Sequence, residues 1–392
     1  MRLISPQDIV ALDEFIALRR DLHAHPELGL EEERTSDLVA RELEGYGYEV
    51  TRGLAKTGLV GTLRCGSGNR AIGLRADMDA LPIIEETGAS YASKTSGLMH
   101  ACGHDGHTAT LLAAARTLAE RQNFDGTLHL IFQPAEENWG GAKIMVEEGI
   151  FDRFPCDAVF GMHNDPSLPF GQFTFRDGPI MAAVDECYIT VQGNGGHGST
   201  PELTSDPIVA GASIVMALQS IVSRNIAALD PAVVTVAAFH GGTVSNIIPS
   251  TAQIVVGIRS FSPSVRDEIE RRIRLIAAAQ AESYGMSATV DYRRSYDATI
   301  NHEAETAFAR DLSRQMWGEA LTVDFDRPMM GSEDFGYMLV EKPGSYFFIG
   351  TAKGPDDPGL HHPKFDFNDD ALALGAAFWV NLAETYLSRD QV

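Results

Sequence analysis

The chain has 392 residues, of which 44% are hydrophobic and 22% charged. These values describe a globular protein long enough for two domains, at about 150 residues per domain. The formal net charge of −23 argues against a nucleic-acid partner and against binding to an anionic membrane surface. For the same reason, an anionic substrate would need local positive charge at its site.

The N-terminal residues, the apolar runs and the cysteines indicate the cellular compartment of the protein. The first residues show no basic region followed by an apolar core, so no signal peptide is expected. No run approaches 18 apolar residues, so no membrane span is expected. The four cysteines are few and widely spaced, which favours a cytoplasmic protein with reduced thiols over a disulfide framework.

The first part of the chain alternates helices and strands. Helical spacing predicts helices over 8–22 and 31–43, with Pro26 between them. His23 and His25 lie at that break, where we expect them to be solvated or to cap a helix. Further on, the pattern predicts short strands at 58–63, 71–76, 126–132, 158–162 and 346–350, and helices at 108–122, 142–148, 305–317 and 370–387. Polar residues follow several of these strands, which is typical of an α/β domain with its chemistry at one sheet edge.

The middle of the chain has a different order. Strands are predicted at 186–192, 233–239, 252–260 and 288–292, and helices at 207–222 and 264–283. The order strand–helix–strand–strand–helix–strand is the split βαβ (ferredoxin-like) arrangement, which forms a self-contained α+β domain. We therefore expect an α/β catalytic domain with a central, mostly parallel sheet, made of residues 1–183 and 295–392, and an inserted domain at 184–294.

The densest group of reactive side chains is the segment Met99–His107, which reads MHACGHDGH. Thiolate and imidazole groups are ligands that borderline-soft divalent metals readily take. Cys102 and His104 are close enough in sequence to converge on one ion, and the glycines allow a tight backbone. The alternative is a histidine-rich helix start in which Cys102 is buried as a small hydrophobic residue.

Further candidate ligands lie elsewhere in the chain. Together the candidates are Cys102, His104, Glu137, His163 and His361. Five ligands are too many for one closed tetrahedral zinc site, and they suit two ions about 3.5–4 Å apart.

The adjacent carboxylates of Glu136 and Glu137 can have two different roles. In extended backbone, neighbouring side chains point to opposite sides, so one carboxylate can hold a metal while the other faces the attacking water. A solvated turn is the alternative for this pair.

Several motifs, in order along nearly the whole chain, resemble those of the M20 metallopeptidases. They are Arg20–Glu27, Arg75–Pro82, Met99–His107, Gln133–Glu137, Gly161–Asn164, Gly196–Gly198 and Leu360–Pro363. The branch that the chain resembles is that of the amidohydrolases, which includes hippurate hydrolases, N-acyl-amino-acid amidohydrolases and plant auxin-conjugate hydrolases.

The resemblance implies a di-metal catalytic domain and an inserted lid or dimerisation domain. It assigns the five candidates above as ligands of two divalent ions (Zn, Mn, Co or Ni), with His361 preferred over His362. It assigns Glu136 as the catalytic base, and it places His197 and Asn246 of the lid near the scissile carbonyl. In some relatives these lid residues come from the partner subunit, which implies at least a homodimer.

The function expected from this resemblance is hydrolysis of the amide bond of a small N-acyl amino acid. A dipeptidase of the same superfamily is one alternative, and a non-catalytic metal-binding protein is another. Because the substrate carries a carboxylate, we expect Arg259 to bind it; the alternative is that Arg259 pairs with an acidic group on its own sheet. Asp165 and Trp139 depart from the usual family pattern, and we expect both to lie near the pocket and to affect which substrate fits.

Overall fold

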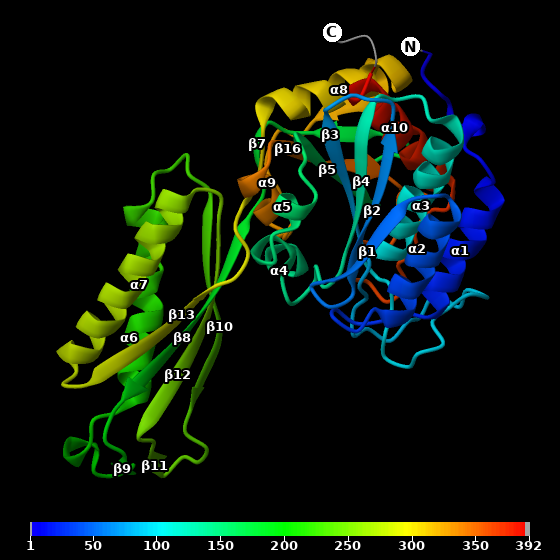
Figure 1. The fold of residues 1–392 in the computed structure, drawn as a ribbon. Coiled ribbons are helices and arrows are strands. Elements are labelled where there is room, and N and C mark those ends of the chain that lie inside the picture. The colour runs from blue at the N-terminus through cyan, green and yellow to red at the C-terminus, as the bar shows by residue number, and fades with distance from the viewer. Residues whose placement is uncertain (1, 389–392) are drawn as a thin grey trace. The chain divides into compact units, whose positions relative to one another are not determined.

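The computed structural model describes residues 2–388 and divides the chain into two compact units. Unit 1 comprises the residues up to Ile180, the segment Thr299–Pro328 and the residues from Glu333 onward. Unit 2 comprises Met181–Ala298 and the short segment Met329–Ser332. Figure 1 shows the helices and strands of both units.

Unit 1 is built on an eight-stranded mixed sheet. In spatial order its strands are β1 (Glu49–Leu54), β2 (Gly58–Cys65), β4 (Gly126–Gln133), β3 (Ala71–Asp77), β5 (Ala158–Asp165), β16 (Gly344–Gly350), β6 (Phe173–Phe175) and β15 (Thr322–Asp324). The four central strands, β4, β3, β5 and β16, are parallel, and antiparallel pairs lie toward both edges. The predicted α/β fold with a mostly parallel central sheet is confirmed. The sequence prediction missed the strands β1, β6 and β15 of this sheet.

The helices of unit 1 cover this sheet. They are α1 (Leu12–Ala24), α2 (Glu33–Gly45), α3 (His104–Arg121), α4 (Gly141–Glu147), α5 (Ile150–Arg153), α8 (Glu303–Trp317), α9 (Gly336–Glu341) and α10 (Asp370–Tyr386), with short 3₁₀ turns at Pro6–Asp8 and Glu319–Leu321. Helix α3 packs against α1, α2, α10 and strand β3 (Figure 1). It begins four residues earlier than predicted, so His104 is its first residue. Strands β7 (Gly178–Met181) and β14 (Thr299–Asn301) pair with each other and form a separate two-stranded sheet.

The central strands end in polar residues at one edge of the sheet. Every residue of β5 and β16 is buried, and so are nearly all residues of β3 and β4. Such continuous burial is typical of parallel strands covered by helices on both faces. Because the strands are parallel, Asp77, Gln133 and the His163–Asp165 segment come together at their carboxyl ends. Strand β5 extends three residues beyond the strand predicted at 158–162, so His163 lies within the strand.

Unit 2 has the predicted split βαβ arrangement. Its elements are β8 (Ala183–Gln192), β9 (Gly196–His197), a 3₁₀ turn at Pro201–Leu203, α6 (Pro207–Leu218), β10 (Ala232–Gly241), β11 (Ile247–Ile248), β12 (Thr251–Ser260), α7 (Pro263–Ser283) and β13 (Ser287–Arg294). The sheet order is β10-β12-β8-β13, with all pairs antiparallel. In α7, Val265, Ile269, Ile273 and Ala277 recur every four residues and form one buried stripe against this sheet.

One helical segment, residues 207–225, is long enough and apolar enough to cross a membrane, judged by length and composition alone. It comprises α6 and a π-helical turn at Ile221–Asn225. Counting runs of apolar residues in the sequence did not show this. In the structure, Ala210, Ile214, Leu218 and Ile221 belong to the apolar core of unit 2. We therefore interpret this segment as a core helix.

A buried group of ion pairs joins α1 to the start of α3. Arg19 and His23 both contact Asp105 at distances of 2.9 and 2.8 Å, and His23 also contacts Glu85 at 3.2 Å. Burial disfavours charge on His23, but the Asp105 and Glu85 carboxylates outweigh it and raise the pKa of His23 to about 9. The prediction that His23 is solvated or caps a helix was wrong, because its side chain is fully buried.

This raised pKa predicts a pH-dependent contribution to stability. Since the pKa of His23 is higher in the folded than in the unfolded protein, its stabilisation should be complete below about pH 6.5 and lost as the pH approaches 9. His23→Gln should therefore lower the free energy of unfolding by on the order of 3 kcal/mol at pH 6 and by much less at pH 9.5. Denaturant unfolding of both proteins at the two pH values measures this difference. An equal loss at both would show that His23 is not charged in the folded protein.

Candidate metal centre

The predicted ligands of unit 1 are held by unusual backbone positions at one edge of the sheet. Gly103 precedes α3 with φ of +93°, and a Cβ there would lie 2.3 Å from the side-chain oxygen of Asn164, so only glycine fits. His361 also has a positive φ of +63°, and its N–H donates to the carbonyl of Ala101 at 2.8 Å. These constraints bring the loop before α3, the end of β5 and the loop around His361 together.

Side-chain atoms that could hold a metal ion form overlapping groups, within each of which they lie within 4.8 Å of one another. One group is Cys102, Glu137 and His361; a second is His104, Glu136 and Glu137; a third is Asp77, His104, His107 and His163. Cys102 Sγ lies 3.4 Å from His163 Nε2, and Glu137 Oε1 lies 3.2 Å from His361 Nε2 and 4.0 Å from His104 Nε2. All five side chains that the sequence suggested as ligands therefore lie in one connected cluster.

The hydrogen bonds of two histidines fit metal binding. Nδ1 of His163 lies 2.7 Å from the carbonyl oxygen of Asn164, and Nδ1 of His104 lies 3.0 Å from that of Asp79. A carbonyl only accepts hydrogen bonds, so each Nδ1 carries a proton, and when the ring is neutral the lone pair lies on Nε2. Nε2 of His104 and Oε1 of Glu137 are buried and have no hydrogen-bond partner in the described part of the chain. Unpartnered groups of this kind suit a cation between them.

Glu136 and Glu137 lie in a tight turn after β4. Ala135 has a positive φ of +55°, and its N–H donates to the buried carboxylate of Glu32 at 2.8 Å. The N–H of Glu137 donates to Asp79 Oδ2 at 3.0 Å. With this anchoring, the buried Glu136 carboxylate also lies near Glu333 and Asp334, whereas Glu137 Oε1 lies near His361 and His104. This geometry is compatible with the predicted roles, in which Glu136 is the base and Glu137 is a metal ligand.

Beneath the turn lies a buried arginine whose role the sequence prediction missed. Arg75 is about 1% exposed and donates to Asp77, Gln133, Glu333 and Asp334 at distances from 2.7 to 3.3 Å. The sequence analysis assigns no role to the segment Gly331–Phe335, which supplies Glu333 and Asp334. Its acidic residues carry no spacing signal, because their partner is 258 residues away in the sequence.

Two more residues support the ligands without being free to bind metal. His107 contacts Asp77 through Nδ1 and Asn164 through Nε2, both at 2.6 Å, so both of its ring nitrogens are engaged. Asp77 in turn lies 3.7 Å from His104 Nε2. Partners of this kind orient metal-binding histidines. The only signals for them in the sequence are that Asp77 follows the predicted strand at 71–76 and that His107 lies in the histidine-rich segment.

The carboxylates of the cluster raise the pKa values of neighbouring side chains, which therefore keep their protons. Burial opposes charge on His104, but Asp77, Asp79 and Glu137 outweigh it and raise the pKa of His104 to about 10. Burial and the Glu137 and Glu136 carboxylates raise the pKa of the Cys102 thiol well above its usual value. Burial and the Glu333 carboxylate likewise raise the pKa of Glu136. In the metal-free protein, protons therefore occupy positions that a cation would take.

The two positions that depart from the family pattern behave differently. The Asp165 carboxylate accepts hydrogen bonds from the N–H and hydroxyl of Ser167 at 2.8 and 2.6 Å, so it stabilises the turn after β5. Trp139, by contrast, is 65% exposed and lies in the same turn as Glu136 and Glu137.

The predicted lid residues lie in unit 2, in two adjoining loops. His197 pairs with Ile247 in the β9–β11 ladder, and the N–H of Gly198 donates to the carbonyl of Asn246 at 2.9 Å. His197 and Asn246 are both exposed, so each is free to contact a ligand. Arg259, on β12, donates to the carbonyl of its neighbour Ile258, and no ion pair to it is found among residues 2–388.

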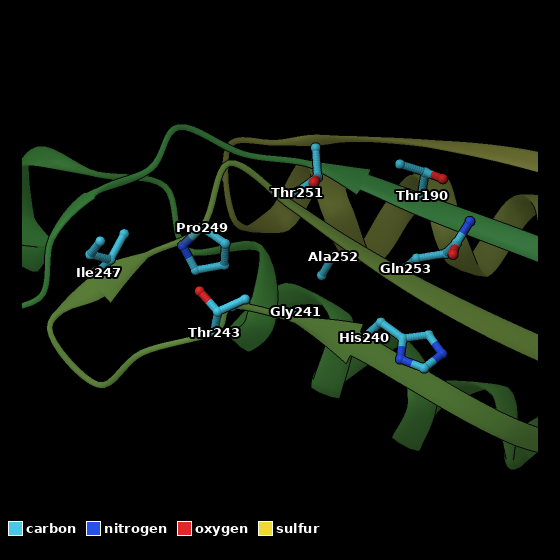
Figure 2. A pocket seen from close by; sticks show the side chains of 10 residues that line it. Thr190, His240, Gly241, Thr243, Ile247, Pro249, Thr251, Ala252 and Gln253 are labelled. Carbon is cyan, nitrogen blue, oxygen red and sulfur yellow. The ribbon is translucent and has the colours of Figure 1, made fainter.

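Unit 2 also contains a surface pocket of about 520 Å³ (Figure 2). Its lining residues are Thr190, His240, Gly241, Gly242, Thr243, Ile247, Pro249, Thr251, Ala252 and Gln253. Of these only His240 can ionise near neutral pH, so the pocket lacks the donor set of a metal centre. Asn246 lies in the loop between two of its lining residues, Thr243 and Ile247.

The fold and the cluster in unit 1 define a class of protein. Thiol, imidazole and carboxylate groups converge at the carboxyl edge of an α/β sheet, next to a buried carboxylate that can act as a base. This is the arrangement of a metal-dependent hydrolase.

Comparisons with known proteins identify the family. Residues 73–385 match the model of Peptidase family M20/M25/M40. The chain is 43% identical to the hippurate hydrolase of Campylobacter jejuni over 99% of this chain and 100% of that one, and 37% identical to the N-acetyl-L-cysteine deacetylase of Bacillus subtilis over 99% and 92%. A solved dinuclear metal-binding M20 peptidase from Bacillus subtilis has a TM-score of 0.83 and 32% identity, over 96% of this chain and 98% of that one. The chain belongs to the M20 family, and its predicted membership of the amidohydrolase branch is confirmed.

The raised pKa values predict that metal binding releases protons. Cys102 and His104 are protonated at pH 7.5 in the metal-free protein and must lose those protons to ligate. Addition of Zn²⁺ should therefore release about two protons per chain from these groups, and the apparent affinity should rise with pH. Calorimetric titration in buffers of different ionisation enthalpy measures the release.

The matched variant is Cys102→Ser, which has no thiol proton to lose. It should bind metal more weakly and release about one proton fewer than the unmodified chain. Equal proton release from both proteins would contradict ligation by the Cys102 thiolate.

Proposed function

We propose that the protein hydrolyses the amide bond of N-acyl amino acids, giving a carboxylic acid and a free amino acid. The observation that carries the proposal is the buried carboxylate of Glu136 beside a cluster of Cys, His and Glu side chains. The names of the relatives support it, because hippurate and N-acetyl-L-cysteine are both N-acyl amino acids.

The residues of unit 1 have distinct parts in this reaction. Cys102, His104, Glu137, His163 and His361 would hold two divalent ions, drawn from Zn, Mn, Co and Ni. Such ions polarise a carbonyl group and activate water for attack at neutral pH. Glu136 accepts the proton of the attacking water and delivers it to the leaving amide nitrogen. His104 and His163 keep their ligating nitrogens turned to the cluster through the Asp79 and Asn164 carbonyls.

We assign three residues of unit 2 to the same reaction. His197 would donate a hydrogen bond to the oxyanion, and Asn246 would contact the scissile carbonyl. Arg259 would bind the substrate carboxylate, since a guanidinium is well matched to a carboxylate and the described part of the chain shows no ion pair to Arg259. We also propose that the protein is a cytoplasmic homo-oligomer, at least a dimer; its few and widely spaced cysteines support a reducing compartment.

A panel of substrates separates this function from its alternatives. The metal-loaded protein should cleave N-acetyl- and N-benzoyl-amino acids faster than dipeptides with a free α-ammonium group. Preference for dipeptides would favour a dipeptidase instead. Absence of any hydrolysis by fully metal-loaded protein would favour a metal-binding protein without catalytic activity.

The first variant prediction concerns the base. Glu136→Gln should keep the metal content and lower kcat at least about 100-fold, the usual size of a general-base contribution. Elemental analysis and initial rates on an N-acyl amino acid measure the two quantities. The matched control is the neighbouring Glu137→Gln, which should lose metal as well as rate. Retention of more than about a tenth of kcat by Glu136→Gln would remove it as the base.

The second variant prediction concerns His197. His197→Ala should lower kcat with metal content unchanged, because it removes a contact made in the transition state. If His197 acts in the partner's site, mixing inactive His197→Ala and inactive Glu136→Gln chains should restore part of the activity. Hybrid dimers that form but stay inactive would contradict a shared site.

A further inference from the structure

The exposed Trp139 is the feature that the reaction above leaves without a role. Its side chain is 65% exposed, whereas Trp379 is almost fully buried and Trp317 is partly buried. No ring contact or cation–π contact to Trp139 is found between residues 2 and 388. A large aromatic side chain left open to water forgoes its hydrophobic stabilisation unless something binds to it.

The position of Trp139 ties it to the metal centre. Glu136 to Trp139 form one turn, and the ends of a four-residue turn lie within about 7 Å of each other. The N–H of Gly141 closes the loop by donating to the carbonyl of Ala135 at 3.0 Å. Trp139 is therefore carried next to the base by the same short loop.

The backbone of the loop that carries Trp139 packs closely against its neighbours. A Cβ at Gly29 would lie 3.2 Å from Cδ1 of Trp139 and 2.9 Å from the Cα of Ala135. A Cβ at Gly141 would lie 1.7 Å from the carbonyl oxygen of Pro134. These two glycines let the loop sit tightly against its support, and the free face of the indole remains toward solvent.

The proposed function indicates which half of the substrate the indole meets. It assigns the substrate carboxylate to Arg259 of unit 2 and the scissile amide to the metal cluster beside Glu136. The acyl group is the part of the substrate that these residues leave without a partner, and the exposed indole in the Glu136 turn can supply one.

We propose that Trp139 is a specificity-determining residue that packs against the acyl group and favours aromatic acyl groups over acetyl. The inference rests on the proposed function. Aromatic pairs gain about 0.5–1.5 kcal/mol beyond burial of their area, which corresponds to roughly two- to tenfold in kcat/KM.

The kinetic test compares N-benzoylglycine with N-acetylglycine on the metal-loaded protein. Trp139→Ala should lower kcat/KM for the benzoyl substrate about five- to tenfold and leave that for the acetyl substrate within about twofold. Trp139→Phe should recover most of the benzoyl rate. The control is Val340→Ala, which removes a 70% exposed apolar side chain from α9, just before the amino end of β16 and therefore at the opposite edge of the sheet. Equal losses on both substrates, or an unchanged ratio of the two, would overturn the proposal.

A binding measurement separates failure of this inference from failure of the proposed function. Metal-loaded Glu136→Gln is titrated with N-benzoylglycine while tryptophan fluorescence is followed, and the signal of Glu136→Gln with Trp139→Phe is subtracted. A fluorescence change from Trp139 with N-benzoylglycine and none with N-acetylglycine supports the contact, even if no N-acyl amino acid is hydrolysed by the unmodified chain. The absence of a Trp139 signal at saturating N-benzoylglycine overturns the contact, whatever the activity.

Discussion

The buried guanidinium of Arg75 is the interaction on which the rest of the centre depends. It joins β3, the end of β4 and the Glu333–Asp334 segment, which are far apart in the sequence. Asp334 also accepts a hydrogen bond from the N–H of Ala142 at 2.9 Å, at the start of α4, where the loop that carries Glu136 ends. A charge removed from water needs such partners, because an unpaired buried arginine would destabilise the fold by several kcal/mol. The position of Glu136 thus depends on a group of buried ion pairs whose disruption would cost several kcal/mol.

The same region has more acidic than basic groups, and this imbalance links stability to metal binding. Asp77, Glu333 and Asp334 all pair with the buried Arg75, and the buried Glu136 lies close to Glu333 and Asp334. In the metal-free protein protons reduce the excess of negative charge, as the raised pKa of Glu136 and that of Asp334 indicate. Divalent ions would neutralise the charge instead, so metal loading should displace protons and tighten the centre.

Features that depend on local sequence pattern, such as the order of helices and strands, could be predicted from the sequence. Strand and helix periodicity was enough for the split βαβ order of unit 2, and the family motifs were enough for the five side chains that meet in unit 1. It missed the short strands β6 and β15, which are defined by pairing rather than by hydrophobic pattern. It also missed the roles of Arg75 and Glu333 and misjudged His23, because burial and long-range ion pairs are set by tertiary contacts that no spacing reveals. The ligand assignments themselves stay predictions.

The most direct test of the account is anomalous diffraction from crystals of the Zn²⁺-loaded protein, recorded on both sides of the zinc absorption edge. The account predicts two anomalous peaks about 3.5–4 Å apart within the cluster of Cys102, His104, Glu137, His163 and His361. Glu136 should contact neither ion directly. A single peak, or two peaks held by Glu136, Glu333 and Asp334 instead, would contradict the account.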